Sequence, residues 1–217
     1  MSRDTSPIPT YAGAVNQERL QQEYPWGPGF LHTYQGMSRT TLEDLQQQRF
    51  TTVMDCAWAT PFYQRIWGEA GISKGDINSL TDLQRLPVID KNMILADVAA
   101  HPPFGSLATR TDRPRGPAVL QTTSGTTGNP QPVIWGAWGR EVQNALLGRI
   151  YGWLGVGADD VAHSVYGHGL VNGGHYVRES VTRYTNAMLL SAGTGIETRS
   201  ERQIAVMHQF GATVLLG

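Results

Sequence analysis

Apolar residues recur at helical spacing in the first half of the chain, and the residues around them mark where helices begin and end. From about Thr41 this spacing predicts a long helix, with Thr40 or Thr41 as its N-terminal cap. Pro61 begins a second helix, and Gly71 suits the C-terminal end of that helix. Residues 39–110 are therefore expected to form a helical region. The apolar positions that carry the pattern are Leu42, Leu45, Val53, Met54, Ala57, Phe62, Ile66 and Trp67.

Two polar residues predict further helix starts within this region. Ser79 and Asp90 each precede a short helical pattern and are expected to cap it. The segment before the region, residues 1–38, is expected to be irregular, because prolines and glycines interrupt every longer pattern between Pro7 and Gly36. Aromatic rings are interleaved with these breaks, so we expect an N-terminal segment that wraps a folded body and is anchored by its rings. These rings belong to Tyr24, Trp26, Phe30 and Tyr34.

In the second half of the chain, strand and helix patterns alternate after a connection rich in proline and arginine at 101–117. This order predicts an α/β fold in which residues 111–217 form a largely parallel sheet flanked by helices. The helix expected at 139–154 would bury Val142, Ala145, Leu146 and Ile150, and the helix at 201–210 would bury Ile204, Met207 and Phe210. The other predicted elements are strands at 118–122, 133–135, 161–166, 187–190 and 213–216 and a helix at 177–184.

Composition and charge narrow the function classes. The chain has 217 residues with 17 Lys and Arg against 18 Asp and Glu, so its net charge of −1 gives no reason to expect a nucleic-acid partner. No apolar run approaches the ~20 residues that span a bilayer, and the N-terminus lacks the apolar segment of a secretory signal. We therefore expect no membrane partner and a cytoplasmic protein. The single cysteine, Cys56, is expected to pack within the apolar face of its helix.

A glycine-rich loop follows the strand at 118–122 and carries the candidate chemistry. Its four hydroxyl groups, on Thr123, Ser124, Thr126 and Thr127, can donate to an anion, and successive backbone N–H groups can form an anion nest. Gly125 and Gly128 leave room for close approach of the backbone. The loop does not match the nucleoside-triphosphatase pattern, because only two residues separate its glycines and no Lys follows the second one. From composition alone, a phosphate loop and an ordinary turn between two strands are about equally compatible with it.

The string 124–130, Ser-Gly-Thr-Thr-Gly-Asn-Pro, resembles the signature loop of the acyl-CoA synthetase, adenylation-domain and luciferase superfamily. Within this adenylate-forming superfamily the chain looks most like the N-terminal portion of the phenylacetate–CoA ligase group. Together with the loop, the supporting stretches span about residues 40–217. They are Ala59-Thr60-Pro61-Phe62-Tyr63 with Glu69-Ala70-Gly71-Ile72, Asp82-Leu83-Gln84-Arg85-Leu86-Pro87, the segment 166–174, and the segments 201–203 and 210–215.

The resemblance implies an acid–CoA ligase fold and activity. ATP would react with a carboxylic acid, most consistent with an aromatic one, to give an acyl-adenylate, and coenzyme A would then take the acyl group. ATP, Mg²⁺ and coenzyme A, or the phosphopantetheine of an acyl carrier protein, are the implied cofactors, and a homodimer is the implied assembly. The loop residues Thr123, Ser124, Gly125, Thr126, Thr127 and Gly128 would hold the ATP phosphates. Gln131 stands where much of the superfamily has Lys, so more of the phosphate charge would fall to Mg²⁺ and the backbone.

The segment after the strand at 161–166 is the candidate acyl pocket. Ligands of open α/β sheets bind beyond the carboxyl ends of strands, and glycines there let a flat ring lie against the backbone. Two of its histidines, His168 and His175, are seven residues apart with no Cys or carboxylate nearby to complete a metal site, so a pocket-lining or hydrogen-bonding role is favoured. His163 is expected to be structural. Arg178 and Glu179 are expected to form an exposed pair without a function. The candidate pocket residues are Tyr166, His168, Gly169, Gly173, Gly174 and His175.

The sequence alone leaves alternatives open. The acyl acceptor could be coenzyme A or a carrier protein of natural-product biosynthesis, and nothing before residue 217 decides between them. A stand-alone module that binds a nucleotide or a partner without catalysis is a third interpretation. Because Gly217 comes directly after a predicted strand, we expect a truncated chain. The later motifs of the superfamily would then lie beyond it, and no catalytic residue is assigned here.

Overall fold

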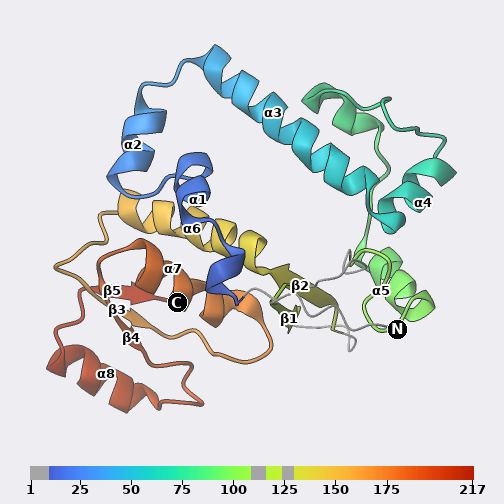
Figure 1. Cartoon of the computed structure of the whole chain (residues 1–217). Helices are drawn as coiled ribbons and strands as arrows, with labels where there is room; N and C mark the ends of the chain where they lie inside the picture. The colour runs from blue at the N-terminus through green and yellow to red at the C-terminus, as the bar shows by residue number, and fades with distance from the viewer. Residues whose placement is uncertain (1–9, 109–115, 124–129) are drawn as a thin grey trace. The chain divides into compact units, whose positions relative to one another are not determined.

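The computed structural model describes residues 10–108, 116–123 and 130–217, which divide into two compact units. The helical unit consists of described residues 37–108 and 130–131, and the α/β unit of described residues 10–36, 116–123 and 132–217. Figure 1 labels the helices and strands along the chain. The mixed α/β architecture that the sequence predicts is confirmed, with the helices of the first unit followed by a parallel sheet in the second.

The helical unit contains α3 (Arg39–Trp58), α4 (Pro61–Glu69), the 3-10 helix η2 (Leu80–Arg85) and α5 (Lys91–Ala100). Local signals place these helices. Ser38 caps α3 by accepting a hydrogen bond from the Thr41 backbone N–H at 3.1 Å, and Asp90 caps α5 through the Met93 N–H at 2.9 Å. Pro61 occupies the first turn of α4. The predicted helices at these positions are confirmed, with the cap of α3 two residues before the earlier of the expected caps.

The core of the helical unit is built mainly from aromatic and aliphatic side chains. Phe62 is fully buried, and the Trp58 and Trp67 rings meet edge to face with centroids 5.0 Å apart. The expectation that Cys56 packs into this core is wrong, because its side chain is exposed. Val53 is also exposed, since the face of α3 that packs on α4 carries Phe50 and Met54 instead.

The α/β unit begins with η1 (Ala12–Ala14), α1 (Gln17–Glu23) and α2 (Pro28–Gln35). The prediction of an irregular segment at 1–38 is therefore wrong for these stretches. Pro28 does not break a helix but occupies the first position of α2, where a backbone N–H is not needed. Asn16 caps α1 through the Arg19 N–H at 2.9 Å.

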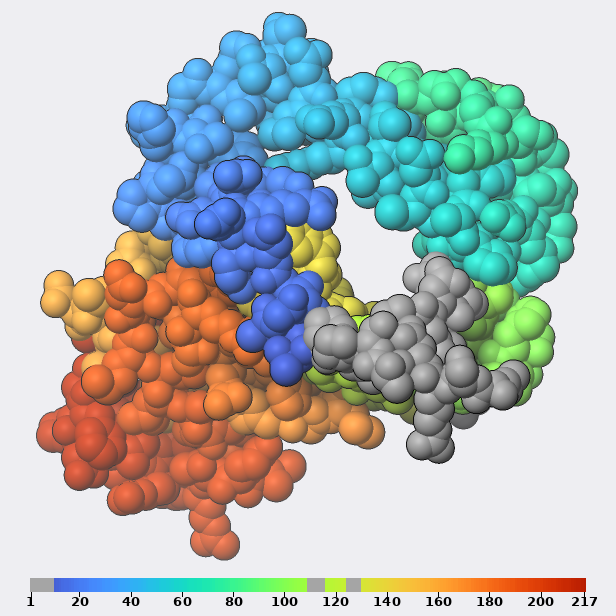
Figure 2. All heavy atoms as spheres, in the orientation of Figure 1, coloured from blue at the N-terminus to red at the C-terminus, as the bar shows by residue number. Residues whose placement is uncertain are grey.

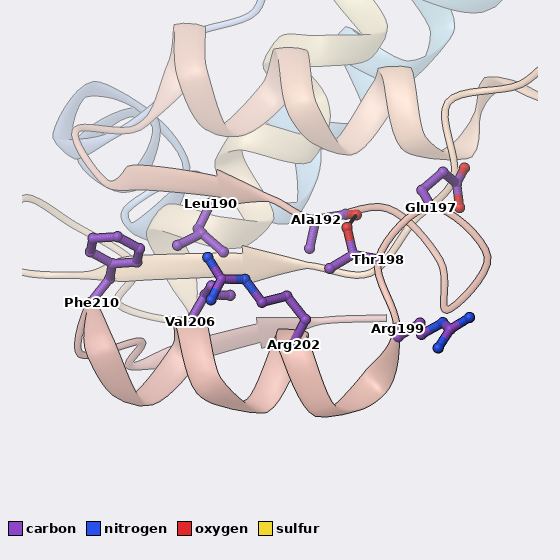
Figure 3. Close-up of a pocket in the computed structure, with 8 residues that line it drawn as sticks. All are labelled: Leu190, Ala192, Glu197, Thr198, Arg199, Arg202, Val206 and Phe210. Atoms are coloured by element: carbon purple, nitrogen blue, oxygen red, sulfur yellow. Dashed lines mark hydrogen bonds between the residues drawn. The ribbon is translucent and has the colours of Figure 1, made fainter.

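The remaining elements of the α/β unit are one hairpin, one parallel sheet and three helices. Strands β1 (Ala118–Thr122) and β2 (Pro132–Gly136) pair antiparallel, so this hairpin is not part of the parallel sheet that the alternation predicts. The parallel sheet has the order β4-β3-β5, with α7 against one face and α8 against the other (Figures 1 and 3). Its elements, with α6 before them, are α6 (Ala137–Trp153), β3 (Val161–Ser164), α7 (Asn172–Tyr184), β4 (Met188–Ser191), α8 (Ser200–Gln209) and β5 (Val214–Leu216).

The long helix α6 buries only part of the predicted apolar face, together with polar residues. Ala145 is fully buried and Val142 is half-buried as predicted, but Leu146 and Ile150 are 39% and 48% exposed. Arg140, Glu141 and Asn144 are buried instead. The reason is that α6 packs on α7 and on the N-terminal segment through hydrogen-bonded polar groups as well as through small residues. A Cβ atom added to Gly148 would overlap the Cβ of Tyr184. In α8 the prediction fails for Ile204 and Phe210, which are exposed, whereas Met207 is half-buried and Gln203 is buried.

The N-terminal segment, residues 10–36, lies against α6 and α7. In Figure 2 its blue spheres cover part of the yellow and orange surface of these helices, and Leu20 is fully buried there. Trp26 meets the Tyr184 ring edge to face at 4.8 Å, and the Arg149 guanidinium lies over the Phe30 ring at 4.9 Å. The predicted anchoring of this segment by its aromatic rings is thus seen in these contacts.

Candidate phosphate and acyl-binding site

The hairpin places the two ends of the predicted phosphate loop side by side. Thr122 of β1 pairs with Pro132 of β2, and the register continues to Ala118 opposite Gly136. Thr123 is described and partly buried, whereas the other predicted phosphate-binding residues lie outside the described residues. Antiparallel pairing therefore fixes where the loop leaves and rejoins the unit. The predicted residues outside the description are Ser124, Gly125, Thr126, Thr127 and Gly128.

The candidate acyl segment runs from Tyr166, just beyond β3, into the first turn of α7. This helix begins at Asn172, five residues before the predicted start, so Gly173, Gly174 and His175 belong to its first turn. A Cβ on Gly174 would overlap the carbonyl oxygen of Gly167, so only glycine lets the segment pass so close to the helix. At Gly173 a Cβ would lie 3.5 Å from the Tyr166 ring, which is an ordinary contact.

Hydrogen bonds hold the two histidines of this segment in place. The His168 Nε2 lies 2.8 Å from the Ser191 Oγ at the end of β4, and the His175 Nε2 lies 3.0 Å from the Gly169 carbonyl oxygen. Because a carbonyl only accepts, the His175 Nε2 carries a proton. The two rings meet edge to face with centroids 5.5 Å apart. Within the described ranges, no group of three His, Cys, Asp or Glu side chains could hold a metal ion.

Glu197 also belongs to this neighbourhood, although the sequence analysis did not single it out. Its carboxylate accepts from the Thr194 hydroxyl and from the Thr194 N–H at 2.9 Å, and its Oε1 lies 3.2 Å from where a Cβ on Gly167 would stand. These hydrogen bonds, led by that of the Thr194 hydroxyl, hold the pKa of Glu197 below its usual value. A hydroxyl residue three positions before a carboxylate is the spacing of a capping box, and that signal could have identified it.

His163 lies at the centre of the parallel sheet. Its side chain is fully buried, and its Nε2 is 3.0 Å from the Gln203 Oε1 of α8. Gln203 donates from its Nε2 to the carbonyl oxygens of Gly193 and Thr198, so His163 must donate to Oε1. This side chain thus ties β3 to α8 and to the loop before it, in agreement with the expected structural role.

The hairpin and the acyl segment are joined directly. The Thr122 N–H, at the end of β1, donates to the Leu170 carbonyl oxygen at 2.9 Å. Two residues later, the Asn172 Nδ2 donates to the Gln143 Oε1 of α6 at 3.1 Å. The structure therefore brings the beginning of the predicted phosphate loop next to the predicted acyl residues.

Glu179 does not form the exposed pair with Arg178 that the sequence suggests. It turns inward from α7 and accepts two hydrogen bonds from Arg140 of α6, at 2.7 and 2.6 Å, and one from Asn144 at 2.9 Å. Burial alone would raise the pKa of Glu179, but the bonds from Arg140 and Asn144 outweigh it and lower that pKa. The sequence gives no signal for this pair, because its members are 39 residues apart.

A pocket of about 530 Å³ lies on the other face of the parallel sheet, between β4 and α8 (Figure 3). Leu190, Val206 and Phe210 form its apolar part, and Arg202 extends along it from α8. None of the predicted site residues that the structure describes lines it. Glu197 connects the pocket to the acyl segment, since it lines the pocket and its Oε1 lies 3.2 Å from where a Cβ on Gly167 would stand.

Comparison with solved structures defines the class to which this fold belongs. The chain matches 2-hydroxyisobutyryl-CoA ligase, in an open conformation with 2-HIB-AMP and CoA, with a TM-score of 0.73 and 24% identity over 83% of this chain and 41% of that one. The same ligase in its thioesterification state matches with a TM-score of 0.73 and 26% identity, over 82% and 37% of the two chains. The fold is therefore that of the adenylate-forming CoA ligases.

Two curated relatives carry the name of the ligase group that the sequence resembles. A phenylacetate–coenzyme A ligase of Aromatoleum evansii is 27% identical over 193 residues, and one of Thermus thermophilus is 30% identical over 180 residues. The matches cover 87% and 82% of this chain but 41% and 38% of the relatives. The expected resemblance to phenylacetate–CoA ligases is confirmed, and the chain spans about two fifths of the length of these relatives. No family model matches the chain.

Proposed function

We propose that this chain is part of an enzyme that activates a carboxylic acid with ATP and passes the acyl group to coenzyme A. The observation that carries the proposal is the similarity to phenylacetate–CoA ligases over more than four fifths of the chain, in a fold shared with a ligase bound to an acyl-adenylate and CoA. The hydrogen bond from Thr122 to Leu170 supports it, because it joins the predicted phosphate loop to the predicted acyl segment.

In this proposal the carboxylate attacks the α-phosphate of ATP, and pyrophosphate leaves. The loop that begins at Thr123 donates hydrogen bonds to the β and γ phosphates and steadies the charge that develops on pyrophosphate. Mg²⁺ bound to the phosphates would supply positive charge that Gln131, in place of the superfamily's Lys, does not provide. A thiol then displaces AMP from the acyl-adenylate and yields the thioester.

An aromatic acid is the proposed substrate class. Tyr166 is 37% exposed, and one side of its ring lies against the first turn of α7, where an added Cβ on Gly173 would meet it at 3.5 Å. A flat apolar ligand could stack on the exposed side of such a ring. The residues Tyr166, His168, Gly169, Gly173, Gly174 and His175 are proposed to line the acyl pocket.

Acid-dependent exchange of labelled pyrophosphate into ATP tests the first half-reaction. The panel contains phenylacetate, benzoate and an aminobenzoate, with 2-hydroxyisobutyrate as the contrasting aliphatic acid. We expect the aromatic acids to support exchange, and EDTA to abolish it. Exchange by the full-length protein with the aliphatic acid alone would contradict the substrate class, and no exchange by that protein with any acid would contradict the function.

The loop assignment has its own test. We expect Thr126→Ala with Thr127→Ala to reduce exchange by on the order of 100-fold or more, since loss of one such donor typically costs ~2.7–4 kcal/mol of barrier. Thr33→Ala with Thr52→Ala is the matched control, because both hydroxyls are exposed and bond only to their own helix. Unchanged exchange in the loop variant would overturn the assignment.

The acceptor and the assembly are further parts of the proposal. Thioester formation with coenzyme A is expected to exceed that with a phosphopantetheinylated carrier protein, and the reverse would assign the enzyme to carrier loading. The cytoplasmic location and the homodimer expected from the sequence are retained as proposals. No helix in the described ranges combines the length and apolar character needed to cross a membrane.

A further inference from the structure

The pair formed by Arg140 and Glu179 joins two helices that lead directly from the two halves of the proposed site. Helix α6 starts at Ala137, immediately after β2 ends at Gly136, so Arg140 in its first turn moves with the hairpin. Helix α7 starts within the acyl segment, and Glu179 lies one helical turn after His175. A contact between these two side chains therefore connects the hairpin to the acyl segment.

The geometry of the contact is specific. The Arg140 Nε and Nη2 donate to the two different oxygens of Glu179 at 2.7 and 2.6 Å, which is a bidentate arrangement. The side chains are only 6% and 15% exposed. Asn144, one turn further along α6, adds a hydrogen bond to the Glu179 Oε2 at 2.9 Å. A planar fork that meets a carboxylate in this way restrains both sliding and rotation of α7 on α6.

Stability alone is a poor explanation for this cluster. Within the described part of the chain, the Arg140 Nη1 and the Asn144 Oδ1 are buried without a hydrogen-bond partner, which carries a cost. Buried ion pairs can often be replaced by apolar side chains of similar volume at no loss of stability. What an apolar replacement does not reproduce is the fixed register between the two helices.

We propose that the Arg140–Glu179 pair is a positioning element that sets the register of the acyl segment relative to the hairpin of the phosphate loop. This inference rests on the proposed function, in which the acid must be held close to the α-phosphate. Because the reacting atoms must approach to about 3–3.5 Å, a displacement of 1 Å can cost about 100-fold in rate. Arg140 and Glu179 act through the segments that they hold and do not touch the substrates.

The test compares three variants of the native protein. Arg140→Met with Glu179→Leu replaces the pair by apolar side chains, and Arg140→Lys keeps the charge but loses the fork. Arg178→Lys, at the exposed neighbour of Glu179, is the control. We expect the double variant to keep its thermal midpoint while kcat/KM for the acid falls about 100-fold. In Arg140→Lys we expect kcat/KM for the acid to fall at least 10-fold, and in Arg178→Lys we expect it to remain unchanged.

The KM for the acid and the dissociation constant for ATP distinguish misplacement of the acyl segment from a simple loss of folded protein. Loss of folded molecules would lower every rate by one factor and leave KM values unchanged. Misplacement is expected to raise the KM for the acid in the double variant while the dissociation constant for ATP stays within twofold of wild type. Wild-type kcat/KM in the double variant, or a uniform loss of rate with unchanged KM, would overturn the inference.

If the wild-type protein shows no acid-dependent exchange, the proposed function fails, but the inference is still decided by hydrogen exchange. We then expect the backbone amides of 119–122 and 170–178 to exchange faster in Arg140→Lys than in Arg178→Lys. Equal exchange in the two variants would show that the pair does not set this register.

Discussion

The two units use buried charge differently. In the helical unit, Asp97 has no exposed side-chain surface and binds Ser106, nine residues away, through the backbone N–H and the hydroxyl, both at 2.6 Å. In the α/β unit, Glu141 binds the hydroxyl of Tyr11, 130 residues away, together with Tyr184 and Arg183. The first carboxylate closes a loop beside its own helix, whereas the second joins the N-terminal segment to α6 and α7.

Each unit is therefore vulnerable to a different kind of substitution. The helical unit depends on a compact core rich in aromatic rings, and its buried Asp97 closes only a local loop. The α/β unit places charges within the contact between α6, α7 and the N-terminal segment, because Arg140, Glu141 and Asn144 are all buried. We therefore expect core truncation to be the most damaging change in the helical unit and loss of a carboxylate to loosen the N-terminal segment in the other.

The largest expected effect is that of Phe62→Ala, which removes a fully buried ring from the helical unit. Replacing a buried Phe by Ala typically costs about 3–5 kcal/mol, because apolar contact is lost and a cavity remains. Urea unfolding followed by tryptophan fluorescence measures the loss, since Trp58 and Trp67 belong to the same core. The control is Val53→Ala at a side chain that is 63% exposed, for which a change below about 0.5 kcal/mol is expected. Equal losses in the two variants would contradict the assignment of this core.

The second-largest loss in the free energy of unfolding is expected for Glu141→Gln. This substitution keeps the shape of the side chain and removes its charge. A hydrogen bond to a charged group contributes about 1.5–3 kcal/mol, so we expect a loss in that range. Amide hydrogen exchange should also accelerate across residues 10–36, because Tyr11 anchors this segment to Glu141 at 2.8 Å. Tyr11→Phe should reproduce part of that acceleration.

The matched control for this second experiment is Glu18→Gln, an exposed glutamate of the same N-terminal segment. It should change neither the urea midpoint nor the exchange of residues 10–36. If Glu141→Gln and Glu18→Gln behave alike, Glu141 does not hold the segment.

The smallest expected effect is the pH dependence of Asp97. Burial raises the pKa of Asp97, but hydrogen bonds from Ser106 and Arg65 outweigh it, so the pKa lies below the usual value. Stabilisation by Asp97 is therefore complete above its unfolded pKa of about 3.9 and is lost as pH falls through the folded value. We measure the free energy of unfolding by urea at pH 7 and at pH 3. The amount by which wild type is more stable than Asp97→Asn should be larger at pH 7. A difference between the two proteins that does not depend on pH would contradict this role.

Local signals account for the parts of the fold that the sequence predicted well. Ser79, Asp90 and Pro61 mark helix starts because a cap acts within one turn of the residue itself. The same reasoning misjudged Pro28, because a proline that begins a helix and one that ends it look alike when no apolar pattern follows. The prediction that Cys56 is packed was wrong for a related reason. Helix α3 carries several apolar residues, and only some of them face α4.

Long-range pairing explains what the sequence could not reveal. The polar face of α6 is buried because Glu179, Tyr11 and Arg183 bind it from distant parts of the sequence. The hydrophobic periodicity of α6 gives no information about these partners. At the candidate site, Tyr166 and Gly173 belong to one short predicted segment, and the structure places the Tyr166 ring against Gly173. The contribution of Glu197 and the link from Thr122 to Leu170 required the folded backbone.

The close approach of α6 and α7 at Gly148 has a consequence for how this protein can vary. With no room for even a methyl group between Gly148 and the Cβ of Tyr184, the two positions are not free to change independently. A mutation that adds bulk at 148 would have to follow, rather than precede, a shift of the 184 backbone or of the helix that carries it. The order in which substitutions accumulate at this crossing is thus constrained, and a library that randomises the two positions together will contain solutions that single-site scanning never reaches.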